Sequence, residues 1–175
     1  MSDKSYLSVY AKSFSWAGFF LPRETLKKCS VLYDFCRVAD NIADDKNEIE
    51  VKEKKFAEFE KDFNQKKFDN LIIKNMWGIM EEFNISTKIV QDLLDGIKSD
   101  IKEKVELNSK KDLLIYSYRV AGTVGLMMAK ILNVTKKNSL KSAIDLGIAM
   151  QLTNISRDVI EDTKNNRFYI EENFE

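Results

Sequence analysis

The sequence predicts an all-α fold, and three observations lead to this prediction. Apolar residues recur at the 3.6-residue period of a helix along the chain, and no stretch alternates convincingly at period 2. Only 6 Gly and 1 Pro occur in 175 residues, far fewer than the turns of an all-β sandwich require. Hydrophobic residues make up 44% and charged residues 32%, the balance of a folded globular chain. The length suits one domain, so we expect a single domain over residues 1–175.

The first predicted helix begins at Pro22, in the N1 position that proline tolerates, with a charged residue pair after it. It ends near Asp45, where a charged stretch interrupts the helical period. A charge-rich amphipathic helix follows, with Phe56, Phe59 and Phe63 along one stripe.

Further helices are expected over residues 68–83, 86–105, 110–132 and 139–165. Ser86 precedes the apolar period of the second of these segments and has the short polar side chain of an N-cap.

Charge and composition exclude several classes of function. The 28 Lys and Arg residues equal the 28 Asp and Glu residues, so no net charge attracts nucleic acid or anionic lipid. The chain has 0 His, which excludes His-containing triads, HExxH proteases and His-ligated zinc or haem. The side chains that remain for catalysis are carboxylates, amides, arginines and tyrosines, with metal ions held by oxygen ligands.

The cysteines and the chain start indicate a cytoplasmic protein. Cys29 and Cys36 lie on one predicted helix, about 10 Å apart, which is too far for a disulfide. Residues 1–6 show no signal-peptide pattern, and no apolar run approaches the length of a membrane span.

A first constellation of polar residues lies on the helix that begins at Pro22. Tyr33, Arg37, Asp40 and Asp44 fall on one helical face. The two carboxylates four residues apart repel each other by a few tenths of a kcal/mol, an arrangement that suits a divalent cation between them. A helical DxxxD alone is usually a solvated face.

A second constellation repeats this chemistry on the last predicted helix. Gln151, Asn154, Asp158 and Asp162 share one face, and Arg157 flanks them. Polar side chains on a stripe that enters an apolar stretch cost about 1–3 kcal/mol each if they stay unsatisfied, so a ligand or metal is the simplest partner. Because the sequence contains two such stripes, we favour a ligand or metal site over a solvated face.

If the two stripes face each other across a cavity, they would form a site for a diphosphate. Carboxylate and amide oxygens suit Mg²⁺, which prefers to share its coordination with substrate phosphates. Arg37, Arg157 and Arg167 supply bidentate donors for phosphate oxygens. Such a site would stabilise diphosphate as a leaving group.

The segment from Tyr116 to Met128 leaves two interpretations open. Its small residues Ala121, Gly122 and Gly125 either let a neighbouring helix pack closely or leave room for a long apolar chain along a tunnel wall. In the second case Tyr116 could place its ring or phenol oxygen beside a carbocation.

Taken together, these motifs resemble the squalene/phytoene synthase family, the head-to-head prenyl transferases. The likeness runs from about Ser5 to Ile170. The matching blocks are Ser13-Phe14 with Leu21-Pro22, Asp40-x-x-x-Asp44, Tyr116 to Gly125, Gln151 to Asp162, and Arg167-Phe168-Tyr169. The joint pattern is far more specific than either DxxxD alone.

The resemblance implies an isoprenoid-synthase-type helical bundle around a central cavity, and it implies a role for each motif residue. The implied ligands of Mg²⁺, with Mn²⁺ as the alternative metal, are Asp40, Asp44, Asp158 and Asp162. The implied contacts to substrate diphosphate come from Arg37, Arg157, Arg167 and Asn154. The implied catalytic residues are Ser13, Tyr33, Tyr116 and Gln151.

Within the family, VAGTVGLMMAK and LGIAMQLTNISRD are most similar to bacterial phytoene synthases. This likeness implies that two geranylgeranyl diphosphates condense through a cyclopropyl diphosphate to phytoene and two diphosphates, a step of carotenoid biosynthesis. No G-x-G-x-x-G unit occurs, in agreement with a reaction that needs no nicotinamide cofactor. The substrate carries a long apolar chain and the product is apolar, so we expect peripheral contact with the inner membrane surface.

Three alternatives stay open. A squalene, dehydrosqualene or hydroxysqualene synthase would use farnesyl diphosphate instead. A non-catalytic assembly-factor homologue should have lost acidic motif residues, and both pairs are present here. A helical interaction domain with solvated acidic stripes would bind no prenyl diphosphate in response to Mg²⁺.

The end of the sequence predicts a longer natural domain. A new apolar segment begins at Arg167, and the chain closes at Glu175 with no capping signal. Members of the family continue past this motif with further helices, so we expect the N-terminal portion of a longer domain.

Overall fold

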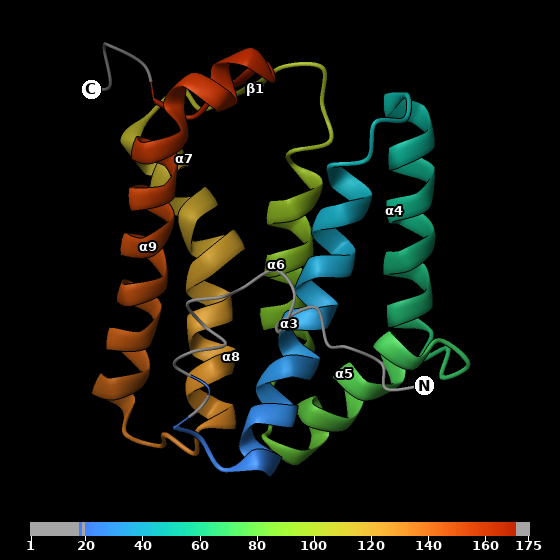
Figure 1. Ribbon diagram of the computed structural model, residues 1–175, viewed down its shortest axis with the longest axis vertical. Coiled ribbons are helices and arrows are strands. Elements are labelled where there is room, and N and C mark those ends of the chain that lie inside the picture. Colours follow the sequence, from blue (N-terminus) through green and yellow to red (C-terminus); the bar gives the residue numbers. More distant parts are fainter. Residues whose placement is uncertain (1–17, 19, 171–175) are drawn as a thin grey trace.

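A computed structural model describes residue 18 and residues 20–170, and it confirms the all-α prediction (Figure 1). The helices are α3 (Arg23–Ala43), α4 (Ile49–Asn64), α5 (Leu71–Glu82), α6 (Thr87–Lys98), α7 (Lys110–Ser117), α8 (Thr123–Ile131) and α9 (Lys137–Lys164). A π-helical turn, η1 (Tyr118–Gly122), joins α7 to α8. Most helices run along the long axis of the bundle, whereas α5 lies across one end (Figure 1). None of the helices in the described part of the chain has the length and apolar character needed to cross a bilayer.

The main core lies between α3, α4, α5 and α6. The Phe35 ring is fully buried, with its centroid 5.4 Å from that of Phe59 and 5.5 Å from that of Phe63. Trp77 stacks on Phe63 at 5.2 Å and donates a 3.0 Å hydrogen bond from Nε1 to the Phe63 carbonyl oxygen. The predicted stripe of phenylalanines on α4 therefore faces the core, and each buried ring contributes about 1.5–3 kcal/mol.

Glycines let α9 approach α8 and η1 at backbone distance. A Cβ atom built on Gly125 would lie 2.2 Å from the carbonyl oxygen of Ala143. A Cβ atom on Gly147 would lie 2.3 Å from the carbonyl oxygen of Ala121. These distances leave no room for a methyl group, so the close-packing interpretation of the small residues is confirmed.

The helix starts agree with the predictions to within a few residues. α3 begins one residue after Pro22, so this proline takes the N-cap position and not N1. Ser86 does lie at the N-cap of α6, but its side chain makes no capping hydrogen bond. The better cap belongs to Asn70, whose side chain accepts hydrogen bonds from the backbone N–H groups of Ile72 and Ile73 at the start of α5.

Two predicted helices have a different course. The segment 86–105 is helical only to Lys98, where Ser99 takes the C-cap position and its hydroxyl donates a 2.6 Å hydrogen bond to the Gly96 carbonyl oxygen. The segment 110–132 is not one continuous α-helix, since η1 interrupts it with π-helical hydrogen bonding. Such turns are frequent at functional sites.

The described residues also contain one short pair of strands, which the sequence analysis did not predict. Strands β1 (Val105–Glu106) and β2 (Arg167–Phe168) pair in parallel, with Val105 opposite Arg167. Two residues are too few to show an alternating pattern in the sequence. The pairing holds the segment after α9 against the loop after α6. Beneath it lies a small second core, formed by Val105, Tyr116, Ile155 and Tyr169.

Candidate active site

The two acidic stripes line one cavity of about 390 Å³ between the C-terminal half of α3 and the C-terminal half of α9. Most predicted site residues contribute to its wall: Arg37, Asp40, Asp44, Tyr116, Gln151, Asn154, Arg157, Asp158, Asp162 and Arg167. Tyr33 is half-buried one turn before Arg37 and is not among the lining residues. Ser13 lies outside the described residues.

The carboxylates of α3 lie at the C-terminal end of that helix. Burial raises the pKa of Asp40 to about 7, and the like charge of Asp44 adds to this effect, while Arg37 opposes it. A positive charge between the two carboxylates would offset their mutual repulsion.

The carboxylates of α9 have contrasting environments. Arg157 donates from Nε to Oδ1 of Asp158 at 2.7 Å, and this hydrogen bond lowers the pKa of Asp158. Burial raises the pKa of Asp162, with Arg167 opposing the shift. The Arg157 side chain is 67% exposed, so its pairing with Asp158 is a surface contact that a bound anion could replace.

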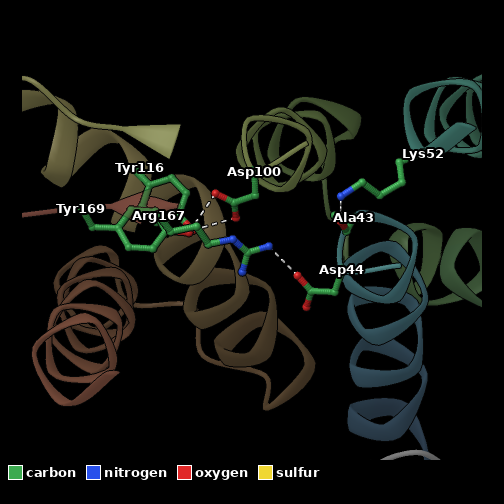
Figure 2. A network of polar contacts seen from close by, with 7 residues as sticks. All are labelled: Ala43, Asp44, Lys52, Asp100, Tyr116, Arg167 and Tyr169. Atoms are coloured by element: carbon green, nitrogen blue, oxygen red, sulfur yellow. Dashed lines mark hydrogen bonds and ion pairs between the residues drawn. The ribbon is translucent and has the colours of Figure 1, made fainter. Parts of the chain in front are cut away.

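An ion pair joins the two ends of the site. Arg167 on β2 donates from Nη2 to Oδ1 of Asp44 at 2.7 Å, as Figure 2 shows. On the far side of Asp44, the Lys52 ammonium donates to the Ala43 carbonyl oxygen at 3.3 Å, at the last residue of α3. The ion pair with Asp44 holds the Arg167 guanidinium in the cavity wall.

A hydrogen-bonded group in the cavity wall was not predicted from the sequence. Asp100, two residues after α6, accepts hydrogen bonds from the Tyr116 hydroxyl at 2.8 Å and from the Tyr169 hydroxyl at 3.0 Å (Figure 2). Burial raises the pKa of Asp100 to about 6, although the hydrogen bond from Tyr116 and the charge of Arg167 oppose this. Asp100 falls inside the predicted helix 86–105, and no sequence motif relates it to Tyr116 or Tyr169.

The donor set fits a Mg²⁺ ion that is shared with a ligand, and not a preformed cage. Within the residues that the structure describes, no three His, Cys, Asp or Glu side chains lie close enough together to hold a metal ion. Each stripe offers two carboxylates, and α9 adds the amides of Gln151 and Asn154. Mg²⁺ keeps several waters and takes few protein ligands when phosphate oxygens complete its shell.

An apolar groove of about 480 Å³ adjoins the charged cavity, and Gln151 and Asn154 line both. Its walls come from η1 and α8 on one side and from α9 on the other. The apolar residues that line it include Val120, Val124, Met128, Leu146 and Met150. Of the two adjacent methionines at the end of the segment from Tyr116, Met128 lines the groove, whereas Met127 is buried in the main core. The same helices therefore pack through glycines and present an apolar groove.

One protein family and several known enzymes are similar in sequence to this chain. A model of the squalene/phytoene synthase family matches residues 7–172. The 15-cis-phytoene synthase of Pantoea ananas is 31% identical over 94% of this chain, and phytoene synthase 1 of Zea mays is 30% identical over 92%. The chain spans 57% of the length of the first relative and 41% of the second.

Solved structures show the same fold. A dehydrosqualene synthase in complex with a ligand superposes with a TM-score of 0.72 at 32% identity, covering 93% of this chain and 57% of that one. The squalene synthase HpnC of Alicyclobacillus acidocaldarius superposes with a TM-score of 0.77 at 18% identity, covering 91% of this chain and 61% of that one.

Proposed function

This chain belongs to the squalene/phytoene synthase family, and on that premise we propose that it forms the diphosphate-binding part of a Mg²⁺-dependent phytoene synthase. The observation that carries the proposal is the cavity between α3 and α9. It combines two pairs of carboxylates with three arginines, and it adjoins an apolar groove.

The charged cavity would receive the diphosphate of a prenyl substrate. Asp40 and Asp44 on one wall, and Asp158 and Asp162 on the other, would hold Mg²⁺ together with diphosphate oxygens. The ion would offset the charge that develops on the leaving diphosphate. Arg37 in the cavity wall would donate to the same oxygens, as would Arg157 and Arg167 after release from their carboxylate partners.

The apolar groove would take the prenyl chain. Gln151 and Asn154 lie where the groove meets the charged cavity, which is where the first carbon of a prenyl diphosphate would ionise. Tyr116 lies in the same cavity wall and could face the resulting cation with its ring or its phenol oxygen. We propose that two geranylgeranyl diphosphates are joined here through a cyclopropyl diphosphate to phytoene, with no nicotinamide cofactor.

A second candidate keeps the same site and changes the substrate. The dehydrosqualene synthase structure is 32% identical to this chain, about as similar as the phytoene synthases. Farnesyl diphosphate would then be the substrate. The product formed from each substrate decides between the two candidates.

The experiment is an incubation of the purified chain with geranylgeranyl diphosphate or farnesyl diphosphate, with and without Mg²⁺, followed by analysis of the extracted hydrocarbon. A Mg²⁺-dependent C40 product supports the proposal, and a C30 product only from farnesyl diphosphate supports the second candidate. Binding is measured in parallel as a thermal shift with Mg²⁺ and an unreactive thiodiphosphate analogue. The absence of any Mg²⁺-dependent shift, in a folded chain, would support a helical interaction domain instead.

Matched variants test the role of the acidic stripes. Asp40→Asn and Asp158→Asn each remove one charge from the cavity, and we expect turnover to fall by at least about 100-fold. Asp145→Asn changes a carboxylate that is exposed on α9 outside the cavity, and it should leave turnover unchanged. An equal effect of all three substitutions would contradict the assignment.

A further inference from the structure

The carboxylate of Asp100, which has no role in the proposed function, is the hub of a hydrogen-bond network in the cavity wall. Its Oδ2 accepts from the Tyr116 hydroxyl at 2.8 Å, and its Oδ1 accepts from the Tyr169 hydroxyl at 3.0 Å. The two phenol oxygens are 3.2 Å apart, and the two rings stack with centroids 4.9 Å apart. Figure 2 shows both phenols converging on this one carboxylate.

Three separate segments of the chain supply the three members. Asp100 comes from the loop after α6, Tyr116 from α7, and Tyr169 from the segment that follows β2. Tyr116 and Tyr169 are each only 6% exposed. All three residues lie in the wall of the charged cavity, so the network fixes the position of that wall.

From this geometry we infer that Asp100 is a positioning residue for Tyr116. One carboxylate oxygen holds the hydroxyl of Tyr116, the other holds the hydroxyl of Tyr169, and the Tyr169 ring supports the Tyr116 ring by stacking. Both phenols donate to Asp100, and the Tyr116 hydroxyl also lies 3.2 Å from the Tyr169 phenol oxygen, so the network sets the orientation of the Tyr116 phenol in the cavity wall. The catalytic consequence rests on the proposed function, in which Tyr116 lies beside a prenyl cation.

A role in positioning differs from a merely structural role in the kinetic constant that changes. We expect Asp100→Asn to lower kcat for prenyl diphosphate by up to about 100-fold, since a small displacement of a reacting group has effects of this size. KM and the Mg²⁺-dependent thermal shift with the thiodiphosphate analogue should stay within about twofold of the unmodified chain. Tyr169→Phe should have a smaller effect on kcat, and adding it to Asp100→Asn should lower kcat little further. If Asp100→Asn lowers kcat, raises KM and lowers the melting temperature together, the role of Asp100 is merely structural and the inference is overturned.

A spectroscopic measurement tests the network without activity. Tyrosine ionisation is followed by absorbance at high pH in the unmodified chain, Asp100→Asn and Tyr116→Phe. The Asp100 charge raises the pKa of both phenols, after the larger effect of burial. Asp100→Asn should therefore move the Tyr116 signal, identified by its loss in Tyr116→Phe, to lower pH, whereas the surface control Asp145→Asn should not.

The two measurements separate this inference from the proposed function. If the unmodified chain neither binds nor converts a prenyl diphosphate, the proposed function fails, and the tyrosine titration still decides whether Asp100 holds Tyr116. If Asp100→Asn leaves that titration and kcat unchanged, the inference fails while the proposed function stands.

Discussion

The backbone contact between α9 and η1 makes a sharp prediction about Gly147. In Gly147→Ala the added Cβ atom would lie 2.3 Å from the Ala121 carbonyl oxygen and 3.0 Å from Gly122 Cα. Ordinary contacts of a Cβ atom begin at 3.4 Å, so the two helices have to separate by about 1 Å. The atoms opposite Gly147 belong to the backbone and cannot rotate away, as a side chain could.

The size of the effect follows from two opposing contributions. Overpacking of a close contact costs about 1–3 kcal/mol, and a backbone obstacle places this case near the upper limit. Replacing a helical glycine by alanine stabilises the helix by about 1 kcal/mol, because alanine has the higher helix propensity. The free energy of unfolding should therefore fall by about 2 kcal/mol, which lowers the melting temperature by about 4–8 °C in a chain of this size.

The chain offers a matched control in Gly78, which is exposed on α5. A Cβ atom at Gly78 would meet nothing within 4 Å, so Gly78→Ala should raise the free energy of unfolding by about 0.5–1 kcal/mol. Both variants are compared with the unmodified chain by urea unfolding, followed by circular dichroism. If Gly147→Ala unfolds at the same or a higher urea concentration than the unmodified chain, the argument from backbone contact is wrong.

Two further predictions concern the pH dependence of stability and a helix cap. Burial raises the pKa of Asp40 to about 7 and that of Asp100 to about 6, from a usual value of 3.8, so the folded chain binds more protons than the unfolded chain in this range. The stability that these two groups contribute is therefore lost as the pH rises through about 6 to 7, so between about pH 4.5 and 8 the free energy of unfolding should fall more in the unmodified chain than in Asp40→Asn. Urea midpoints at about pH 4.5, 6 and 8 measure this difference, and an equal pH dependence of the two proteins contradicts it. The side chain of Asn70 accepts from two backbone N–H groups at the start of α5, so Asn70→Ala should lower the free energy of unfolding by about 1 kcal/mol. Ser86→Ala is the control, since Ser86 lies at an N-cap without such a hydrogen bond and should cost clearly less in the same urea experiment.

The sequence predicted those features that depend on local spacing. Phe56, Phe59 and Phe63 recur at the helical period, and all three face the core. Asp40 and Asp44 lie one turn apart on α3, so their approach to each other needed no knowledge of tertiary structure. The same holds for Asp158 and Asp162 on α9, and the cavity lined by both pairs agrees with the expected arrangement.

The features that the sequence did not predict depend on contacts between distant segments. Asp100 joins Tyr116 and Tyr169 only because α6 ends early and β2 folds back beside β1. The apolar period continues past Lys98, so it does not indicate that α6 ends there. Tyr33 shares the helical face of Arg37, but the cavity does not extend to it, because spacing along a helix gives direction and not depth.

The short β1–β2 pairing also has a consequence for the order of folding. It joins residues 105–106 to residues 167–168, whereas the helices that surround the main core follow one another closely along the chain. Contacts between distant residues close late because their loop entropy must first be overcome. A pairing of two residues outside the main core should also open more readily than a core helix, so we expect the backbone amides of Val105 and Leu107, which donate to the carbonyls of Asn166 and Phe168, to exchange with solvent deuterium faster than those in the middle of α3. The helical scaffold would then persist through brief openings in which Arg167 and Tyr169 leave the cavity together.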